Sequence, residues 1–537
     1  MRWFFDFVVQ YILFLLTKLS IFSIDNYFIK YIILINRIKK MENEKSSRIQ
    51  SKNEEEPPDS KNLILTKNIK NANPTMEMGS FFISKKESTF NISVRSTNKG
   101  IRLTVADQYF DIIYPNDSWL KYPDFYKKVL AENLAFALTL HLSYLYENIS
   151  SMNFSMARPI TEPFFFKAFM LALPSTALMN KQGSSDLIKK FFKIEYKFLK
   201  DKNILNPNLS ARETNKTAVL PFTFGKDSLL TFSLCKELGI KTIPVFVKEP
   251  FTEQENRHKE ILRTKFLEEF GEEVLTIDNQ AGMLREPGNG WHGWELQLTQ
   301  YATMFLPIVY SNKARYFLFS NEQSCNDKFL DNENFWCNPV YEQSTEWLRQ
   351  IEDIIQILGI KNLRVGSLIE PLHELAIIKI LHNRYPKFAK YQTSCFAEKA
   401  EGKNNRWCGN CSKCARIYIF FLAHNIDPKK IGIPSNMLKI EYKNKYTLFG
   451  SSSMKDLGYD QSGLGRDEQL LAFLMAHKNG HKGDLMTLFE SLYLEEALKK
   501  EKELKQKFFS IYPGNTVPTE LQSQILNIYK EELKDLI

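Results

Sequence analysis

The sequence predicts an α/β protein whose parallel sheet carries helices on both faces, preceded by a smaller α+β domain and followed by a cysteine-bearing helical region. From residue 217 onward, short apolar segments of strand length alternate with segments whose apolar residues recur at helical spacing. Strands separated by helices form parallel sheets with right-handed crossovers. A chain of 537 residues is too long for one core, so we expect about two to four domains.

The expected strands and helices follow one another in a regular order. The strands are residues 218–224, 242–247, 273–277 and 315–319, and the helices are residues 227–238, 253–270 and 295–306. Gly239 is well placed to end the first helix. Ligands of such sheets bind beyond the carboxyl ends of the strands, so residues 223–228 and 320–327 are expected on one rim. We assign residues 215–390 to this domain.

The regions on either side of this domain have other patterns. Apolar and polar residues alternate over 81–114, which predicts strands, and helical spacing over 126–147 and 162–172 predicts helices. We therefore expect a separate α+β domain at residues 80–210, with no chemistry that we can assign. Residues 441–537 are expected to be mostly helical, with a charged amphipathic helix over 492–507 that faces solvent.

Residues 1–75 are expected to comprise an apolar segment and a disordered polar linker. The apolar runs 3–16 and 27–35 contain polar or charged residues and fall short of the roughly 18 uninterrupted apolar residues expected of a spanning helix. Three interpretations compete: an amphipathic membrane anchor, a weak signal sequence, or a translated upstream stretch with the true start at Met41. We favour the third, because Met41 opens a polar segment, and we expect no firm membrane partner.

The composition is ordinary for a globular protein, with 44% hydrophobic and 25% charged residues. The net charge of +9 would attract phosphate-bearing partners, but a generally lysine-rich composition explains it better. Seven cysteines, four of them crowded between residues 395 and 414, do not resemble a secreted disulfide framework. They indicate a metal site in a reducing compartment, so we expect a cytoplasmic protein.

A candidate phosphate-binding loop, Thr-Phe-Gly-Lys-Asp-Ser, lies at residues 223–228 between an expected strand and an expected helix. Gly225 permits the tight turn, and the helix directs unpaired N–H groups and its positive end at the loop. Ser228 can add a hydroxyl donor, and Asp227 can hold Mg²⁺. This is not a Walker loop, because its Gly-x-x-x-x-Gly-Lys spacing is absent here.

Cys395, Cys408, Cys411 and Cys414 form a candidate metal site. Two C-x-x-C steps share Cys411, and Cys395 can fold back as the fourth ligand. Four thiolates suit tetrahedral zinc, and a closed shell of four cysteines leaves no position open for catalysis. An Fe–S cluster is the alternative, because spacing alone does not choose the metal. We place this zinc module at residues 391–440.

The loop resembles the Ser-Gly-Gly-x-Asp-Ser loop of the PP-loop ATP pyrophosphatases. Gly225, Asp227 and Ser228 match, Thr223 stands where that family has Ser, and Phe224 replaces its first Gly. The resemblance implies an adenine-nucleotide hydrolase-like fold that binds ATP with Mg²⁺ and releases AMP and pyrophosphate. Together, the loop and the cysteines are similar to those of 7-cyano-7-deazaguanine synthase, which is much shorter and differs between the motifs.

Four blocks between residues 217 and 430 resemble UDP-N-acetylmuramoyl-L-alanyl-L-glutamate epimerase, a bacterial peptidoglycan enzyme that consumes ATP. They are Gly-Lys-Asp-Ser at 225–228, Ser-Asn-Glu-Gln-Ser at 320–324, Ser-Leu-Ile-Glu-Pro-Leu-His-Glu-Leu at 367–375 and Arg-Trp-Cys-Gly-Asn-Cys-Ser-Lys-Cys at 406–414. The resemblance implies a nucleotide-sugar peptide as substrate. The expected nucleotide-binding residues are Thr223, Gly225, Lys226, Asp227, Ser228 and Asn321.

Epimerisation of a glutamyl residue would explain the use of ATP. The α-hydrogen beside a free carboxylate is hard to remove, because the product would be a dianion. Conversion of the carboxylate to an acyl-adenylate, with loss of pyrophosphate, makes this hydrogen acidic. A base then removes the proton, an acid returns it on the other face, and water releases AMP; such groups must lie within hydrogen-bond reach.

The candidate catalytic residues on the rim are Asp227, Glu322, Cys325 and His292, with Asp327 beside them. The zinc site does not use Cys325, whose thiol is either an acid–base group or a small buried filler. His292 is either part of the site or a loop histidine bonded to backbone. His373 and Glu374 fit the start of a helix as well as a site.

Two other functions stay open at this point. A PP-loop enzyme that modifies a nucleobase or tRNA would use the same loop. RNA is nevertheless not favoured and DNA is not expected, because we find no compact Arg/Lys face interleaved with aromatics. The third function is a non-catalytic nucleotide-binding protein, and Phe224 is its best support.

Overall fold

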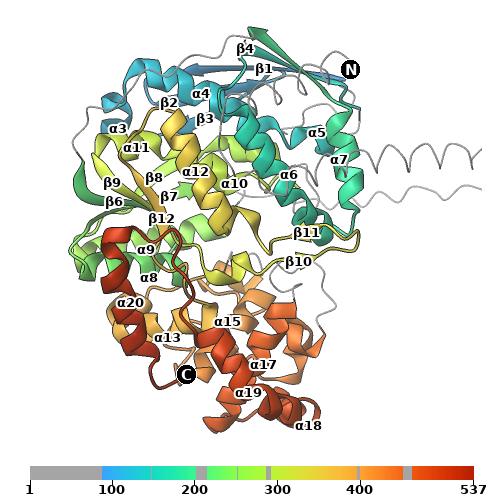
Figure 1. The fold of residues 1–537 in the computed structure, drawn as a ribbon, viewed down its shortest axis with the longest axis vertical. Helices are drawn as coiled ribbons and strands as arrows, with labels where there is room; N and C mark the ends of the chain where they lie inside the picture. The colour runs from blue at the N-terminus through green and yellow to red at the C-terminus, as the bar shows by residue number, and fades with distance from the viewer. Residues whose placement is uncertain are drawn as a thin grey trace, which may run out of the picture. The chain divides into compact units, whose positions relative to one another are not determined.

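A ten-stranded sheet lies at the centre of the structure (Figure 1). This computed structural model describes residues 88–146, 148–200, 214–250, 252–285, 292–395, 400–450 and 463–536. The strand order is β12-β9-β6-β7-β8-β3-β2-β1-β4-β5. The apolar segment and linker expected at residues 1–75 lie outside the described residues.

Five parallel strands form one half of the sheet. They are β6 (Asn215–Pro221), β7 (Lys241–Lys248), β8 (Leu275–Asn279), β9 (Ala314–Phe319) and β12 (Arg364–Ser367). Their spatial order is β8-β7-β6-β9-β12. From β6 the chain adds β7 and β8 on one side and then β9 and β12 on the other, so the direction in which strands are added reverses between β6 and β9. In such sheets a crevice opens at the reversal, beyond the carboxyl ends of the strands. The four predicted strands are confirmed. The fifth strand, β12, was not predicted, because it has only four residues, including a glycine, and so gives too weak a strand signal.

Helices cover both faces of this half, as predicted. Ala218 and Leu220 of β6 belong to one core, whereas Val219 between them belongs to the other. The first core contains α8 (Lys226–Glu237), α9 (Glu253–Phe270), α13 (Glu374–Arg384) and α15 (Ser412–Ala423). The second contains α10 (Gln297–Met304), α11 (Leu306–Ser311) and α12 (Thr345–Ile357). Gly239, with φ +62°, follows the last turn of α8 as expected.

The other half of the sheet comes from the residues that precede β6. Its strands are β1 (Thr89–Ser96), β2 (Gly100–Val105), β3 (Gln108–Ile113), β4 (Ser151–Ala157) and β5 (Glu195–Lys200), and its helices are α3 (Asn116–Lys121), α4 (Asp124–Thr139), α5 (Leu142–Leu145), α6 (Glu162–Met179) and α7 (Ser184–Phe192). Strand β3 pairs antiparallel with β8, and the apolar residues of α4 and α6 share the second core. The described residues of this region, 88–146 and 148–200, therefore extend the same sheet and core, which corrects our expectation of a separate domain at residues 80–210. Alternation shows that a strand buries one face, but not which sheet it joins.

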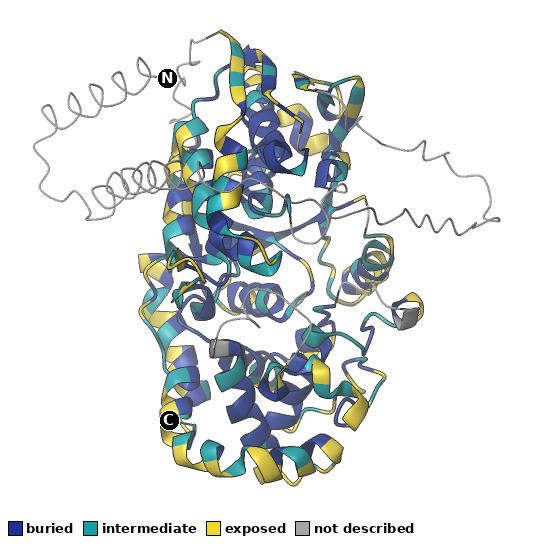
Figure 2. Ribbon diagram, turned by 90° about the vertical axis from the view of Figure 1, so that its right-hand side faces the viewer, coloured by how far each residue is buried: buried dark blue, intermediate teal, exposed yellow. Residues whose placement is uncertain are grey.

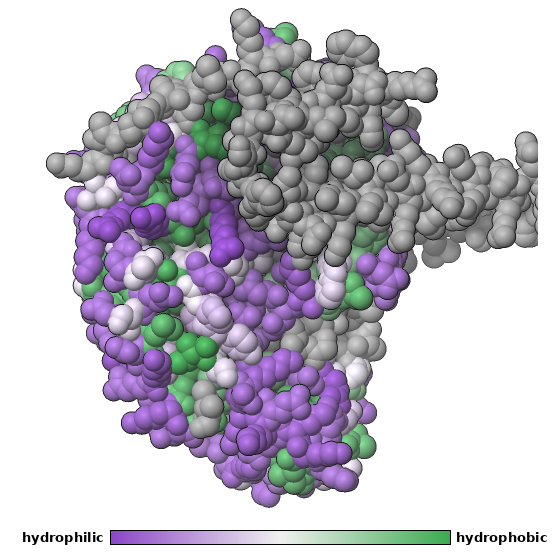
Figure 3. Space-filling view, in the orientation of Figure 1, coloured by the Kyte–Doolittle hydropathy of each residue, from purple (hydrophilic) through white to green (hydrophobic). Residues whose placement is uncertain are grey.

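The described residues that follow β12 are mostly helical, and they include helices in the region 441–537 where we predicted them. Besides α13 and α15 they form α14 (Pro386–Ala389), α17 (Gly463–Lys478), α18 (Asp484–Leu492), α19 (Leu494–Phe509) and α20 (Thr519–Leu533). Figure 2 shows buried residues on the inner sides of these helices and exposed residues on their outer sides. Their surface is mostly hydrophilic (Figure 3), in agreement with the charged helix expected over 492–507. Of the helices in the described ranges, none combines the length and apolar character needed to cross a membrane.

A C-terminal strap, residues 510–518, closes the edge of the sheet at β12. The N–H of Ser367 donates to the Thr516 hydroxyl (3.3 Å). Thr516 in turn donates through its N–H (2.6 Å) and its hydroxyl (2.8 Å) to the buried carboxylate of Glu370. The strap lies so close to the strand that a Cβ on Gly366 would meet the Thr516 carbonyl oxygen at 1.9 Å.

We expect Gly366→Ala to lower the free energy of unfolding by about 1–3 kcal/mol, because the added methyl group forces the strap off β12. Denaturant unfolding would measure this loss, and hydrogen exchange would show faster exchange at residues 510–518. Arg364→Ala, at an exposed position of the same strand, serves as the control and should change neither. Equal stability of the two variants would contradict the close packing of the strap.

Candidate functional site

The phosphate loop, residues 223–228, connects β6 to α8 through one left-handed residue. Phe224 has φ +57°, which costs a residue with a Cβ about 1–2 kcal/mol. Its side chain is fully buried, and the ring centroids of Phe222 and Phe266 lie 4.8 and 5.5 Å away. Burial of a phenylalanine contributes about 1.5–3 kcal/mol and offsets this strain. Phe224 thus makes a left-handed turn of the kind that usually requires glycine.

Helix α8 starts directly at this loop, and no side chain caps it. Gly225 is the N-cap residue, with φ −70° and ψ 162°. The Ser228 hydroxyl donates to the Gly225 carbonyl (3.2 Å) and accepts from the N–H of Thr223 (3.4 Å), which holds the loop against the helix. Uncapped N–H groups and the positive end of the helix dipole together suit a phosphate group.

A buried lysine lies behind the loop. Lys259 of α9 donates from Nζ to the carbonyl oxygen of Thr223, and its nearest carboxylate is that of Glu255, 3.8 Å away. Burial lowers the pKa of Lys259 to about 8, although Glu255 opposes this shift. The ammonium group therefore adds positive charge beside the loop at neutral pH.

A carboxylate–lysine cluster joins the ends of three neighbouring strands. Nζ of Lys226 lies 2.6 Å from Oδ1 of Asp227, 3.1 Å from Oε1 of Glu374 and 3.5 Å from Oε2 of Glu322. Asp227 follows β6, Glu322 follows β9 and Glu374 follows β12. Arg416 of α15 completes the cluster, with its Nε 3.1 Å from Oε2 of Glu374.

The protonation of this cluster follows from burial and from the two cations. Burial disfavours the ammonium of Lys226, but the surrounding carboxylates outweigh it and raise its pKa. Burial would also raise the pKa of Glu374, but Arg416 and Lys226 lower it, so Glu374 is ionised at neutral pH. Burial raises the pKa of Glu322 well above its usual value despite Lys226. Glu322 is therefore the member suited to hold a proton and release it.

Asp227 and Asn321 are the members of the site that remain available to a ligand. The side chain of Asp227 is 31% exposed, and one carboxylate oxygen engages Lys226. A carboxylate of this kind suits Mg²⁺, which usually takes one or two protein carboxylates together with phosphate oxygens. Asn321 lies two residues after the end of β9. Its backbone carbonyl accepts from the Ser367 hydroxyl (2.7 Å), while its buried side-chain Nδ2 has no partner. Thus Asn321 presents a free donor at the reversal of strand order.

Cys325 lies next to this cluster, in the short 3₁₀ turn Gln323–Asn326. Its thiol donates to Oε1 of Gln343 at 3.3 Å. Burial, together with the charge of Glu322, raises the pKa of Cys325 well above its usual value. The thiol is protonated, and both expectations for it, an acid–base group and a buried filler, stay open.

The structure does not bring His292 to the loop. Its ring packs on Tyr144 of α5, with the centroids 5.4 Å apart. Burial and the charge of Lys190 lower its pKa. His292 thus contacts the half of the sheet that precedes β6, which corrects its assignment to the rim. The sequence could not show this, because an apolar neighbour 148 residues earlier leaves no local signal.

The four predicted cysteines come together. The Sγ atoms of Cys395, Cys408, Cys411 and Cys414 all lie within 4.8 Å of one another, and those of Cys408 and Cys414 are 3.8 Å apart. Tetrahedral zinc with Zn–S bonds of about 2.3 Å requires sulfur atoms about 3.8 Å apart, so the set fits zinc. Backbone N–H groups of Cys408 and Cys414 donate to sulfur at 3.3 and 3.4 Å. This cluster can hold zinc through four thiolates.

The cysteine cluster is attached to the phosphate loop at one point and to the carboxylate–lysine cluster at another. The N–H of Thr393, two residues before Cys395, donates to the Phe224 carbonyl at 2.8 Å. Cys411 is the N-cap residue of α15, which carries Arg416 to Glu374. Any metal held by these thiolates therefore supports the loop without contacting it.

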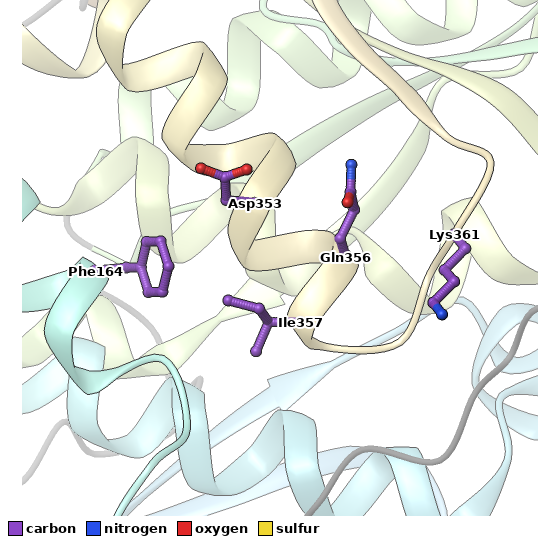
Figure 4. A pocket seen from close by; sticks show the side chains of 5 residues that line it. All are labelled: Phe164, Asp353, Gln356, Ile357 and Lys361. Carbon is purple, nitrogen blue, oxygen red and sulfur yellow. The ribbon is translucent and has the colours of Figure 1, made fainter. Parts of the chain in front are cut away.

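A surface hollow of about 380 Å³ lies elsewhere, between α6 and the end of α12 (Figure 4). Phe164, Asp353, Gln356, Ile357 and Lys361 line it. None of these residues follows the carboxyl end of a parallel strand, so we assign it no role in the site.

Sequence reasoning missed Lys259, placed Arg416 among the basic residues around the cysteines without its pairing to Glu374, and left Glu374 undecided. Lys259 shares a helix face with the buried Leu262 and Phe266, three and seven residues later. Arg416 is a single charge within an otherwise apolar buried segment of α15. A charged residue at a core position of a helix signals a buried partner, and this signal is readable from the sequence.

Comparisons with known proteins do not assign this chain to a family. Neither the protein-family models nor the curated proteins give a match to this chain. The functional argument therefore depends on the fold and on the site.

We expect about one zinc per chain, lost in any Cys→Ser variant of the cluster. Because the metal ties Cys395 to α15, the loss should lower the free energy of unfolding by at least about 2 kcal/mol. Metal analysis and thermal unfolding would test this. Cys337→Ser, which changes a buried cysteine outside the cluster, is the matched control and should keep its zinc. Iron with a visible absorption band, or no metal at all, would contradict the zinc assignment.

Proposed function

We propose that this protein is an ATP-dependent enzyme that activates a carboxylate by adenylation, with AMP and pyrophosphate as products. One observation carries the proposal: the uncapped start of α8 and the carboxylates of three strand ends meet where the strand order reverses. That place is where sheets of this type bind nucleotides. The likeness of residues 223–228 to the PP-loop adds the expectation that the nucleotide is cleaved to AMP.

The residues present fit a nucleotide with its metal ion. The N–H groups of residues 226–228 and the Ser228 hydroxyl would hold phosphate oxygens, and Asp227 would hold Mg²⁺, which neutralises charge on the phosphates. Lys259, which donates to the Thr223 carbonyl of the loop, adds a positive charge that favours an anionic ligand there. Phe224 makes the turn without glycine, so it no longer favours a non-catalytic protein.

The most specific form of the proposal is epimerisation of the terminal L-glutamate in a UDP-N-acetylmuramoyl dipeptide, a step of peptidoglycan precursor synthesis. A carboxylate oxygen of the substrate attacks the α-phosphorus, a C–O–P linkage forms, and the bond to pyrophosphate breaks. The neighbouring C–H is then acidic enough to lose its proton to a base, and an acid returns a proton on the opposite face. Water finally replaces AMP on the carbonyl carbon. The four resembled blocks support this substrate, and three of them each contribute a carboxylate beside Lys226.

Glu322 is the first acid–base group of this mechanism. It lies beside Lys226, and its raised pKa lets it hold a proton at neutral pH and exchange it during turnover. The Ser324 hydroxyl donates to its Oε1 at 3.0 Å and fixes its orientation. Cys325 is a further candidate for the same role.

We expect Asp227→Asn and Ser228→Ala each to lower turnover at least about tenfold, which corresponds to about 1.4 kcal/mol in the barrier. Pyrophosphate release in the presence of substrate, ATP and Mg²⁺ would measure it. Ser233→Ala, which removes a hydroxyl bonded within the same helix, is the matched control and should keep turnover. Formation of ADP and phosphate instead would contradict the proposed reaction.

With the glutamyl dipeptide in heavy water, we expect deuterium at the α-position of the D-product. Inversion through a deprotonated carbon exposes that carbon to exchangeable protons. Omission of ATP should abolish both inversion and exchange, because the free carboxylate leaves the hydrogen unreactive. Cys325→Ala should keep pyrophosphate release and lose exchange only if the thiol transfers the proton. Release of AMP with tRNA or a nucleobase, and not with the dipeptide, would favour the base-modifying alternative.

A further inference from the structure

A second carboxylate lies on the same rim, five residues after Glu322. Asp327 follows the 3₁₀ turn that carries Cys325, and its side chain is 26% exposed. Its Oδ2 accepts no hydrogen bond, and the nearest basic group is Nε2 of His373, 3.7 Å away. Since Asp327 follows β9 and His373 follows β12, the two neighbouring parallel strands direct them to one edge of the sheet.

His373 is buried, and neither of its ring nitrogens has a hydrogen-bond partner. An unsatisfied buried polar atom costs about 1–3 kcal/mol, and native proteins retain few of them. The ring is held from two sides by Phe508 and by Tyr512 of the C-terminal strap, each with its centroid 5.2 Å away in an edge-to-face arrangement. An apolar side chain would fill this space at lower cost, so packing alone does not explain the histidine.

We propose that Asp327 is a second proton-transferring residue of this site and that His373 is the positioning residue behind it. The inference rests on the proposed epimerisation, which requires two such groups on opposite faces of the α-carbon. Asp327 reaches the surface and can contact substrate, whereas His373 lies beneath it. The distance of 3.7 Å is too long for a hydrogen bond, but catalytic hydrogen bonds are often long before substrate binds.

The proton balance requires a route to solvent. One of Glu322 and Asp327 takes the α-proton, and the electron pair stays on carbon, delocalised into the activated carbonyl group. The other group then donates its own proton to the opposite face, so each turnover leaves one group protonated and the other deprotonated. Before the next turnover the protonated group must release its proton and the deprotonated group must take one up; the partly exposed Asp327 exchanges with water directly, and Glu322 exchanges through water that enters the open site. The N–H of His373 stabilises the ionised form of Asp327 through this cycle.

The charges around the pair come from four elements. Burial raises the pKa of Asp327, while Gln323 and Lys507 of α19 oppose this shift. Burial, aided by Lys507, lowers the pKa of His373 to about 3, although Glu374 opposes it. Tyr512 also faces Asp327, and burial and this carboxylate raise its pKa. The imidazole is therefore neutral and acts as a hydrogen-bond donor rather than as a base.

The first test uses Asp327→Asn with each epimer of the dipeptide, ATP and Mg²⁺ in heavy water. Pyrophosphate release should stay within about threefold of wild type, since the carboxylate takes no part in activation. Inversion should be lost, and α-hydrogen exchange should persist with one epimer and disappear with the other. Asp353→Asn, a change on α12 away from the site, should behave as wild type.

Three results would overturn the inference: unchanged inversion in Asp327→Asn, loss of exchange from both epimers, or loss of pyrophosphate release in a folded protein. If wild type itself releases no pyrophosphate with the dipeptide, the proposed function fails instead. The two failures are thus distinguishable.

The second test uses His373→Phe, which keeps a ring between Phe508 and Tyr512 but removes both nitrogens. Stability should be equal to or higher than that of wild type, because two unsatisfied buried atoms disappear. Exchange at neutral pH should fall at least about tenfold. The acid limb of its pH profile should move to higher pH, because ionised Asp327 loses its donor. His424→Phe, which removes a half-buried imidazole bonded to the Leu375 carbonyl, should lower stability but leave exchange and its pH profile unchanged. An unchanged exchange rate and pH profile in His373→Phe would show that the histidine only fills space.

Discussion

The ammonium group of Lys226 is the point on which the arrangement of the site depends. It has almost no contact with solvent, and three carboxylates from three separate strand ends surround it. A buried charge is tolerated only when its partners are in place, and loss of one partner typically costs about 3–5 kcal/mol. The loops after β6, β9 and β12 are therefore held in one relative position by a shared electrostatic requirement.

The cysteine cluster extends this constraint beyond the sheet. Cys411 begins α15, Arg416 of the same helix reaches Glu374, and Glu374 reaches Lys226. A metal at the thiolates would thus fix the start of a helix whose fifth residue holds one carboxylate of the cluster. A metal site with no open coordination position can therefore stabilise the phosphate loop although the metal does not contact it.

Short-range sequence patterns predicted most of the parallel half of the sheet, but little of how the rest of the chain packs against it. The strand at 218–224, the helix at 253–270 and the four cysteines each carry a signal within a few residues, and the structure contains all three. The pairing of β3 with β8 and the contact of His292 with Tyr144 join segments more than a hundred residues apart. Only the tertiary fold decides such pairs. The charges at buried helix positions, Lys259 and Arg416, fall between these cases, because the sequence shows that a partner is needed but not which one.

The two regions without an assigned chemistry cover the edges of the parallel half of the sheet. A parallel sheet with bare edges exposes unpaired N–H and C=O groups, which invite association with other chains. Strand β3 covers β8 at one edge, and the C-terminal strap covers β12 at the other. The strap also brings Tyr512 against His373, and α19 brings Phe508 and Lys507 to the same place. The C-terminal helices are thus part of the wall of the site, and a truncation before them would remove both the cover of β12 and the surroundings of Asp327.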